Sequence, residues 1–274
     1  MMKLIGWAFF FICTSLFLFS LFDDRNQQFK LPENAKGINF DLVKPHSPGY
    51  PFSLPAMQRT IRVIDGTVIN EEQVNYILSK LPLEQTNGSF AWGQGDFEVS
   101  TVAKGMDRNF HFANSFLVNF VPFKEVAAWV PVAALSRNKA YETDIKNNHV
   151  LDLWQTSQEA FYYPTGDCED HSIALADWLI GLGYDARVVL GTVDNIGHAW
   201  VIIIYESKVY LVEATDKSQR NKFTIPLAEY YPGYLPYAMF NRETYWVNTG
   251  SKLGSNYLSQ QWANRSNYAE IKLP

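Results

Sequence analysis

Residues 163–172, with the sequence YPTGDCEDHS, combine a cysteine with three carboxylates and a histidine. Cys168 is the only cysteine outside the apolar N-terminal segment, and the residues after it have apolar side chains at helical spacing. The pattern predicts a helix that begins at Cys168 and is terminated by Gly183. A helix N-terminus stabilises the thiolate, which is the nucleophilic form of cysteine, through its unpaired N–H groups and its dipole.

A nucleophilic cysteine needs a base, and the base needs a partner that orients it. His198 opens a predicted strand at 198–205 and follows a glycine that leaves room for a substrate. Glu213 lies near the end of the next predicted strand, 209–215. A helix start, a strand start and the end of the next strand can meet at one edge of a sheet. Cys168, His198 and Glu213 are therefore the candidate nucleophile, base and orienting acid.

The register of the predicted hairpin leaves a second acid open. With the turn centred on Ser207, Glu213 faces Val201, which lies roughly 10 Å along the strand from His198. The same count places Asp216 opposite His198, so Asp216 is the alternative acid. A bulge or an earlier turn would bring Glu213 back to the histidine.

Three acids flank the cysteine, namely Asp167, Glu169 and Asp170. Acids in the first turn of a helix favour its dipole, but they also raise the pKa of a nearby thiol, which opposes catalysis. Zinc is a poor match, because the thiol and the histidines His171 and His198 lack the usual paired spacing of zinc ligands. We interpret His171 as a solvated or packed residue rather than as the base.

The chain has 274 residues, of which 47% are apolar, and a formal charge of −5. It contains no cluster of five to eight Lys or Arg residues, so nucleic acid is excluded as a partner. The two cysteines make no disulfide framework.

Residues 4–22 are apolar and uncharged, and as a helix they would span roughly 28 Å, close to the thickness of a bilayer core. They predict a single-pass transmembrane anchor at 1–22. Lys3 precedes the run and Asp23 follows it, which places the ectodomain outside the cytoplasm, in the periplasm or the extracellular space. A cleaved signal peptide is the competing interpretation, although Phe and Leu occupy the region where a cleavage site needs small residues.

The rest of the chain divides into three predicted parts. Residues 23–58, with five prolines, predict a stalk. Residues 59–148 form the N-terminal part of the ectodomain and include a predicted helix at 69–81 capped by Asn70. Residues 149–274 hold the catalytic core and a C-terminal wrap, with a predicted helix at 149–162 leading to the cysteine. The fold class is α+β, a cysteine-led helix packed on an antiparallel sheet.

The stretch GDCEDHSIALADWLIGLGYDARVVLG, followed by HAWVIIIYESKVYLVEAT, resembles the transglutaminase-like cysteine protease superfamily. The resemblance covers about residues 150–216 and implies a papain-like fold with the catalytic order Cys, His, Asp. It implies Cys168 as nucleophile, His198 as base and Glu213 as the partner of the histidine. The family usually has Asp at the last position, so Glu213 is a departure, but the ending VEAT favours it over Asp216.

The resemblance also implies an oxyanion donor in the lead-in to the cysteine, for which Gln158 and Trp154 are the candidates, beside the backbone N–H of Cys168. The expected function is a membrane-anchored peptidase or amidase that acts on a protein or peptide through a thioester. No cofactor is required. The alternative is calcium bound by Asp167, Glu169 and Asp170, as in some extracytoplasmic members. The alternative functions are protein crosslinking and a non-catalytic binding module on the same fold.

Overall fold

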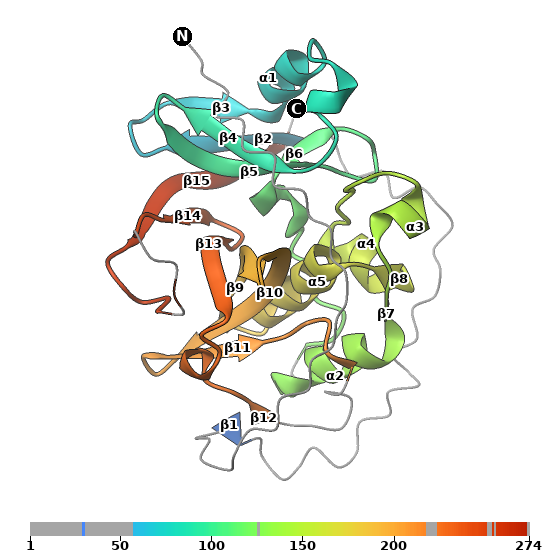
Figure 1. Ribbon diagram of the computed structural model, residues 1–274, viewed down its shortest axis with the longest axis vertical. Helices are drawn as coiled ribbons and strands as arrows, with labels where there is room; N and C mark the ends of the chain where they lie inside the picture. Colours follow the sequence, from blue (N-terminus) through green and yellow to red (C-terminus); the bar gives the residue numbers. More distant parts are fainter. Residues whose placement is uncertain are drawn as a thin grey trace.

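The computed structural model describes residues 29–30, 57–124, 127–217, 224–250, 254 and 256–272. The fold is a mixed α/β arrangement with a large antiparallel sheet and few helices (Figure 1). The predicted combination of a cysteine-led helix with an antiparallel sheet is present: α5 (Cys168–Gly181) packs against β9 (Asp185–Val193) and β10 (Ile196–Tyr205).

The eight strands of the main sheet follow the order β11-β10-β9-β13-β14-β15-β2-β3, and every neighbouring pair is antiparallel. The remaining six strands of this sheet are β2 (Met57–Val63), β3 (Val68–Asn70), β11 (Lys208–Val212), β13 (Tyr234–Phe240), β14 (Thr244–Asn248) and β15 (Trp262–Lys272). A second sheet contains β4 (Phe90–Gln94), β5 (Phe97–Lys104) and β6 (Phe110–Phe112). Two short pairs join β1 (Phe29–Lys30) to β12 (Thr224–Ile225) and β7 (Ala140–Tyr141) to β8 (Thr165–Gly166).

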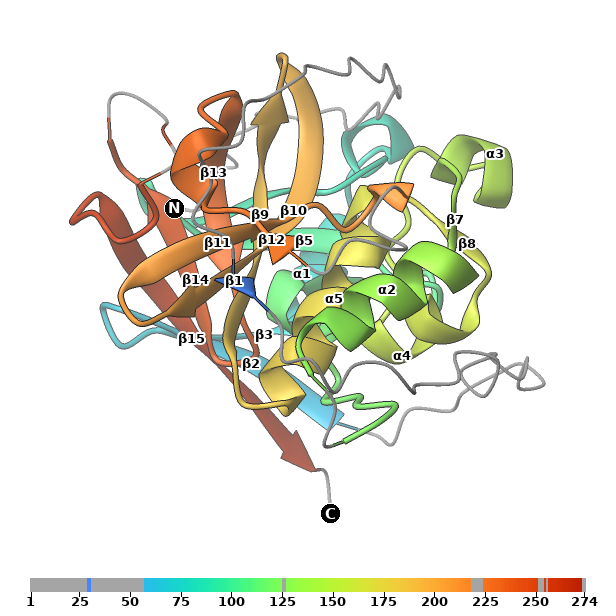
Figure 2. The ribbon, with the colours of Figure 1, turned by 90° about the horizontal axis from the view of Figure 1, so that it is seen from below.

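The other α-helices are α1 (Glu71–Leu78), α2 (Trp129–Asn138), α3 (Asp144–Asn148) and α4 (Ser157–Tyr162). In the part of the chain that the structure describes, 3₁₀ turns cover Leu83–Gln85, Ala113–Phe116 and Ala228–Tyr230. Figure 2 shows α2, α4 and α5 together on one side of β9 and β10. Asn70 caps α1 as predicted, in a capping box with Gln73.

Helix α5 is buried on all sides over nearly its whole length, from Cys168 to Leu179. One side packs on the sheet, where Ala199 and Val201 belong to the same buried cluster as Ile173 and Leu175. On another side, Trp178 packs among apolar residues of α2. Gly183, in the left-handed region at φ 91°, follows the end of the helix as the sequence predicts. A helix enclosed in this way is the central element of its domain.

Two-residue turns set the register of the strands beside α5. Asp194–Asn195 joins β9 to β10, and Glu206–Ser207 joins β10 to β11; all four residues have positive φ. Such turns match the right-handed twist of a hairpin. The second turn is centred between residues 206 and 207, half a residue earlier than predicted, and pairs Val201 with Val212. The predicted pairing of Glu213 with Val201 is therefore wrong by one residue.

Side chains alternate along β10 between the two faces of the sheet. Ala199, Val201 and Ile203 pack in the cluster that contains α5, whereas Trp200 and Ile202 pack on the opposite face in a cluster rich in aromatic residues. The indole of Trp200 lies over the neighbouring strands at Gly191, where a Cβ would stand 2.4 Å from the ring. The absence of a side chain at Gly191 is what lets the indole lie against the sheet.

Residues 149–162, predicted to be one helix, form a helix only from Ser157 onward. The backbone N–H groups just before it have partners elsewhere: Leu153 donates to Asp144, Trp154 to Lys104 and Gln155 to Asp170. These longer-range hydrogen bonds exclude the i to i−4 bonds of a helix. The expected C-terminal wrap supplies β13, β14 and β15 to the main sheet, and β15 pairs with β2 near the start of the described chain.

The expected single-pass membrane localisation is wrong for the described part of the chain, where no helix is long and apolar enough to cross a bilayer. The longest described helix, α5, has 14 residues. At 1.5 Å per residue it spans about 21 Å, less than the roughly 30 Å of a hydrocarbon core. The predicted anchor at 1–22 and most of the predicted stalk at 23–58 lie outside the described residues.

Gly191→Ala tests whether the bare backbone under Trp200 is needed. The added methyl collides with the indole and with the backbone at Leu235 and Pro236, so we expect the free energy of unfolding to fall by about 1–3 kcal/mol in urea titrations. Gly233→Ala is the matched control, because a Cβ there meets nothing within 4 Å. Equal stability of the two variants would contradict this account.

Candidate functional site

Cys168 is the first residue of α5, and its side chain is 1% exposed. Asp167 occupies the N-cap position but makes no side-chain cap to the helix. The thiol donates a hydrogen bond to Oε2 of Glu169 over 3.4 Å. The cysteine therefore stands where a helix dipole favours a thiolate, while the acid that accepts from its thiol disfavours one.

His198 and Glu213 are in hydrogen-bond contact, with 2.9 Å between Nε2 and Oε2. The observed register explains the contact. Continued past Val212, it would place Glu213 opposite Trp200, on the same face of the sheet as His198 and diagonal to it. A diagonal neighbour is within reach of a long side chain, and Glu is one methylene longer than the Asp usual in the resembled family.

The carboxylate of Glu213 is held from several sides. Oε1 accepts from the backbone N–H of Thr215 at 3.0 Å and from its hydroxyl at 2.7 Å. Oε2 accepts from His198 and from the hydroxyl of Tyr234, each at 2.9 Å. Burial raises the pKa of Glu213, but the His198 charge and the hydrogen bonds from His198 and Thr215 outweigh burial and lower it to about 2. Glu213 is therefore ionised at every physiological pH.

Two aromatic rings flank the imidazole of His198. The Trp200 ring is stacked with it at 6.1 Å between centroids, and the Tyr234 ring is tilted at 6.3 Å. The histidine side chain is 14% exposed. The ring is thus confined by its strand neighbour, by Tyr234 and by Glu213, and keeps a narrow opening to solvent.

Acidic side chains crowd the start of α5. Carboxylate oxygens of Asp144, Asp167 and Glu169 lie within 4.8 Å of one another, and all three residues are buried. The sequence predicts Asp170 as the third calcium ligand, but the acid that lies with Asp167 and Glu169 is Asp144 of α3. Burial raises the pKa of Asp144 and of Glu169, and the charge of Asp167 raises both further.

Asp170 faces a different environment, in which its Oδ1 accepts from the backbone N–H of Gln155 at 2.8 Å. The nearby cation is Lys139, which is 2% exposed. Its ammonium donates to Oε1 of Gln155 at 3.0 Å and to the carbonyls of Tyr163 at 3.3 Å and Thr165 at 2.8 Å. Burial lowers the pKa of Lys139 to about 8, although the surrounding carboxylates act in the opposite direction.

The oxyanion candidates and the alternative acid lie in other environments. Trp154 is a core side chain that packs against Phe116 and Phe240, and Gln158 lies half-buried on α4. The backbone N–H of Asp216 donates to the Glu213 carbonyl at 3.3 Å, and its carbonyl accepts from Ser136.

His171 is fully buried and stacks on Tyr141. Burial, together with the charges of Lys217 and Lys139, lowers its pKa well below the usual value. It is therefore a neutral packed residue.

Sequence reasoning missed Lys139, Asp144 and Tyr234. Lys139 and Asp144 lie more than 20 positions before the cysteine, and Tyr234 lies in a tyrosine-rich stretch far beyond the histidine. No spacing signal connects these residues to the motif. The residues directly before Lys139 are Ser136, Arg137 and Asn138, so its sequence neighbours do not indicate that it is buried.

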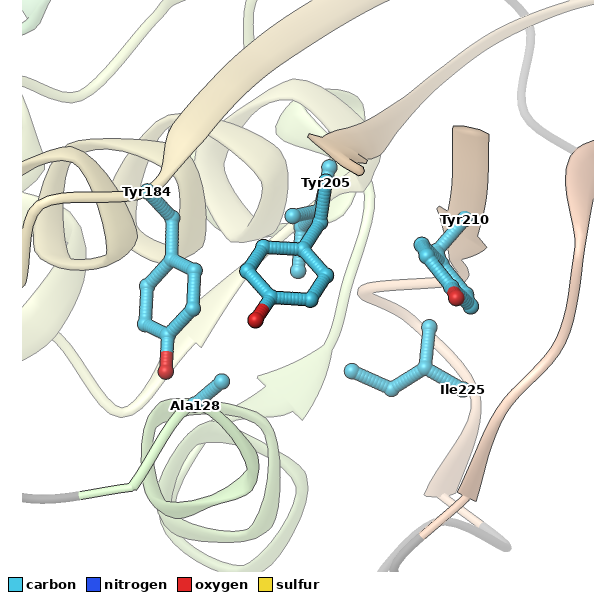
Figure 3. A pocket seen from close by; sticks show the side chains of 6 residues that line it. Ala128, Tyr184, Tyr205, Tyr210 and Ile225 are labelled. Carbon is cyan, nitrogen blue, oxygen red and sulfur yellow. The ribbon is translucent and has the colours of Figure 1, made fainter. Parts of the chain in front are cut away.

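A small apolar pocket opens at the other end of β10, seven residues along the strand from His198 (Figure 3). Figure 3 shows three tyrosine rings around it, and its lining consists of Ala128, Tyr184, Ile203, Tyr205, Tyr210 and Ile225. It holds no group that could act on a substrate carbonyl. The pocket is therefore separate from the candidate active site.

Residues 152–271 match the family model described as the CEP76 peptidase-like domain. A 38-residue segment is 55% identical to the Centrosomal protein of 76 kDa from Danio rerio, which is 14% of this chain and 6% of that protein. The chain thus matches only a small part of that relative. The family match supports a peptidase-like fold for residues 152–271.

Among solved structures, the chain is similar to LapG of Legionella pneumophila. The TM-score is 0.37, with 20% identity over 51% of this chain and 75% of that chain. A calcium-bound structure of LapG gives a TM-score of 0.37 and 21% identity, over 55% of this chain and 81% of that chain. Likeness at this level carries no argument about activity or metal binding.

The buried carboxyls predict how stability varies with pH. Burial raises the pKa of Asp152 from 3.8 to about 6, and the pKa values of Asp144, Glu169 and Asp170 are raised as well. These carboxyls therefore hold more protons in the folded state than in the unfolded state above pH 4, and the stability that they contribute falls as pH rises. In a chelator, we expect the melting temperature to fall between about pH 4 and pH 7.

Asp144→Asn should flatten this decline, because it removes one of the carboxyls that resists ionisation. Asp185→Asn, which changes a partly exposed carboxylate on β9, is the control and should leave the slope unchanged. Melting curves recorded across the pH range in a chelator give the comparison. A melting temperature that rises over this interval would contradict the assignment.

Proposed function

We propose that the protein is a cysteine peptidase or amidase of transglutaminase-like type, in which Cys168 is the nucleophile, His198 the base and Glu213 the acid that orients it. The observation that carries the proposal is the 2.9 Å hydrogen bond between His198 and Glu213. The same chain places Cys168 at the first position of the buried helix α5. An ionised acid fixes the tautomer of the histidine and stabilises its imidazolium form.

The proposed reaction is acyl transfer through a thioester. Because Nε2 of His198 is bonded to Glu213, Nδ1 is the nitrogen that takes the proton from the thiol. The thiolate attacks the carbonyl carbon of an amide, the C–N bond breaks, and the imidazolium returns its proton to the leaving amine. Water, deprotonated by His198, then attacks the thioester and releases the acid and the thiol. The backbone N–H of Cys168 is the proposed donor to the oxyanion.

The substrate is proposed to be a protein or peptide. Water as acyl acceptor gives hydrolysis, and an amine gives crosslinking by the same thioester. We place hydrolysis first, since the sequence shows no long insertion near the proposed site.

Calcium is the cation that the acid cluster fits. The donors of Asp144, Asp167 and Glu169 are all oxygen atoms, as calcium prefers. Oε1 of Glu169 is buried and accepts no hydrogen bond from the described residues, so it has a coordination position to offer. When bound, the cation would supply positive charge that offsets the repulsion between these carboxylates and a thiolate at Cys168.

A non-catalytic binding module is the second candidate. Its supporting observations are the burial of Cys168 and the hydrogen bond from its thiol to Glu169, both of which favour the protonated thiol. On this proposal, the same fold would bind a protein partner without cleaving or modifying it.

Cys168→Ala tests the enzyme. We expect turnover of peptide amides to disappear while the melting temperature shifts by only a degree or two, because the side chain is small. In the unmodified chain, the rate of iodoacetamide alkylation against pH should give a thiol pKa well below 7. Full activity in the alanine variant would reject the enzyme, and a thiol pKa near the free value of about 8.5 would favour the binding module.

Glu213→Gln and Asp216→Asn form a matched pair for the same assay. The glutamine variant keeps the size of the side chain but loses the charge beside His198, so turnover should fall on the order of 10²–10⁴-fold. The asparagine variant should retain activity, because the carboxylate that contacts His198 is that of Glu213. Inactivation by Asp216→Asn alone would reverse the assignment.

Calcium should raise both the melting temperature and the alkylation rate of Cys168 at neutral pH, and excess chelator should remove both effects. Magnesium should do less, because it demands strict octahedral geometry. Asp144→Asn should abolish the response, whereas Asp170→Asn, which alters an acid outside the cluster of three, should keep it. No change with calcium or chelator in the unmodified chain would reject the site.

A further inference from the structure

The hydroxyl of Tyr234 donates to the same carboxylate oxygen that the imidazole of His198 contacts. Both hydrogen bonds to Oε2 of Glu213 measure 2.9 Å. Burial and the charge of Glu213 raise the pKa of Tyr234, so the phenol keeps its proton and acts as the donor. Tyr234 therefore touches the orienting acid directly.

Tyr234 reaches this oxygen from a distant part of the sheet. It is the first residue of β13, which pairs with β9, whereas Glu213 follows β11 on the far side of β10. Three strand spacings separate β13 from β11, or about 14 Å. The side chains of Tyr234 and Glu213 together span this distance, on the face of the sheet that carries Trp200. The Tyr234 ring stands edge-on to the Trp200 ring at 5.1 Å between centroids. Sheet pairing alone does not bring these residues together.

Thr215 already fixes where the carboxylate lies. Its backbone N–H and its hydroxyl both bind Oε1, and both come from a residue only two positions after Glu213. The position of the carboxylate therefore does not depend on Tyr234. What the tyrosine adds is a second donor on Oε2, which draws negative charge away from the bond to His198.

We propose that Tyr234 acts through Glu213 to lower the basicity of His198. The proposal rests on the proposed function only for the role of His198 as the base. A less basic imidazole gives a more acidic imidazolium, which releases its proton more readily to a leaving amine. The tyrosine therefore makes the thiolate–imidazolium pair less stable but makes protonation of the leaving amine easier. The other titratable groups that act on Glu213 or Tyr234 are Tyr231, whose pKa is raised by burial and by the charges of Asp216 and Glu213, and Tyr257, which faces Tyr234.

The test is Tyr234→Phe, which keeps the ring against Trp200 and removes only the hydroxyl. It is made in the full chain carrying Cys168→Ala, so that the titration of His198 is not coupled to the thiol. Histidine-selective ¹⁵N NMR then follows the ring of His198 against pH. We expect its pKa to rise by about half a unit or more relative to the parent, because Glu213 loses a competing donor.

Tyr257→Phe is the matched control. It removes a buried hydroxyl from the same aromatic cluster, one that bonds to the indole N–H of Trp200 at 3.0 Å rather than to Glu213. The pKa of His198 should be unchanged in this variant. An equal rise in both variants would show that packing causes the effect, and an unchanged or lowered pKa in Tyr234→Phe would overturn the proposal.

Thiol alkylation in the Cys168 chain gives a second measurement. A more basic His198 accepts the thiol proton more readily, so Tyr234→Phe should move the acid limb of the alkylation rate to lower pH. The NMR titration requires no catalysis. If the protein shows no turnover but the pKa of His198 still rises in Tyr234→Phe, the enzymatic function is rejected and the proposed effect of Tyr234 on His198 stands.

Discussion

Burial of the first turn of α5 is the constraint on which the rest of the structure depends. The helix is enclosed by the sheet, α2 and α4, so the acids beside Cys168 are removed from water together with it. Asp167, Glu169 and Asp170 would ionise readily in solvent, but buried charges are costly unless they are paired. Much of the surrounding architecture can be understood as a response to that cost.

Lys139 is a buried cation that partly offsets the negative charge of these acids. Its ammonium interacts with the acids and also binds the carbonyls of Tyr163 and Thr165, in the segment that leads to the cysteine. Gly166, the last residue of β8, has no room for a side chain, because a Cβ would stand 2.5 Å from Asp170 Oδ2 and 2.7 Å from Lys139 Nζ. Charge compensation and the path of the backbone before Cys168 are therefore coupled.

Within the described residues, His111 and His198 each contact carboxylates, and their geometry separates their roles. His111 has a carboxylate on each ring nitrogen, Glu71 on Nδ1 at 2.8 Å and Asp107 on Nε2 at 3.0 Å. Burial opposes protonation, but the two acids outweigh it and raise the pKa of His111 to about 9. That histidine is a permanent cation that ties β6 to α1. His198 contacts a carboxylate through Nε2, and its proposed role as a base falls to Nδ1.

The sequence by itself determined the local elements of this protein. Apolar spacing after Cys168 and the glycine at 183 define α5, and β-branched runs define the strands that carry His198 and precede Glu213. These features depend on contacts between residues close in the chain, which is why periodicity and turn chemistry find them. The candidates Cys168, His198 and Glu213 follow from the same local motifs.

Only the tertiary structure decided how these residues meet. The φ values of Glu206 and Ser207 place the turn half a residue earlier than counting predicts, and this shift moves Glu213 to the face of His198. A change of one residue reverses the face of every side chain, so register lies beyond the precision of sequence patterns. Lys139, Asp144 and Tyr234 act over long sequence separations, through burial and charge that exist only once the sheet and helices have packed.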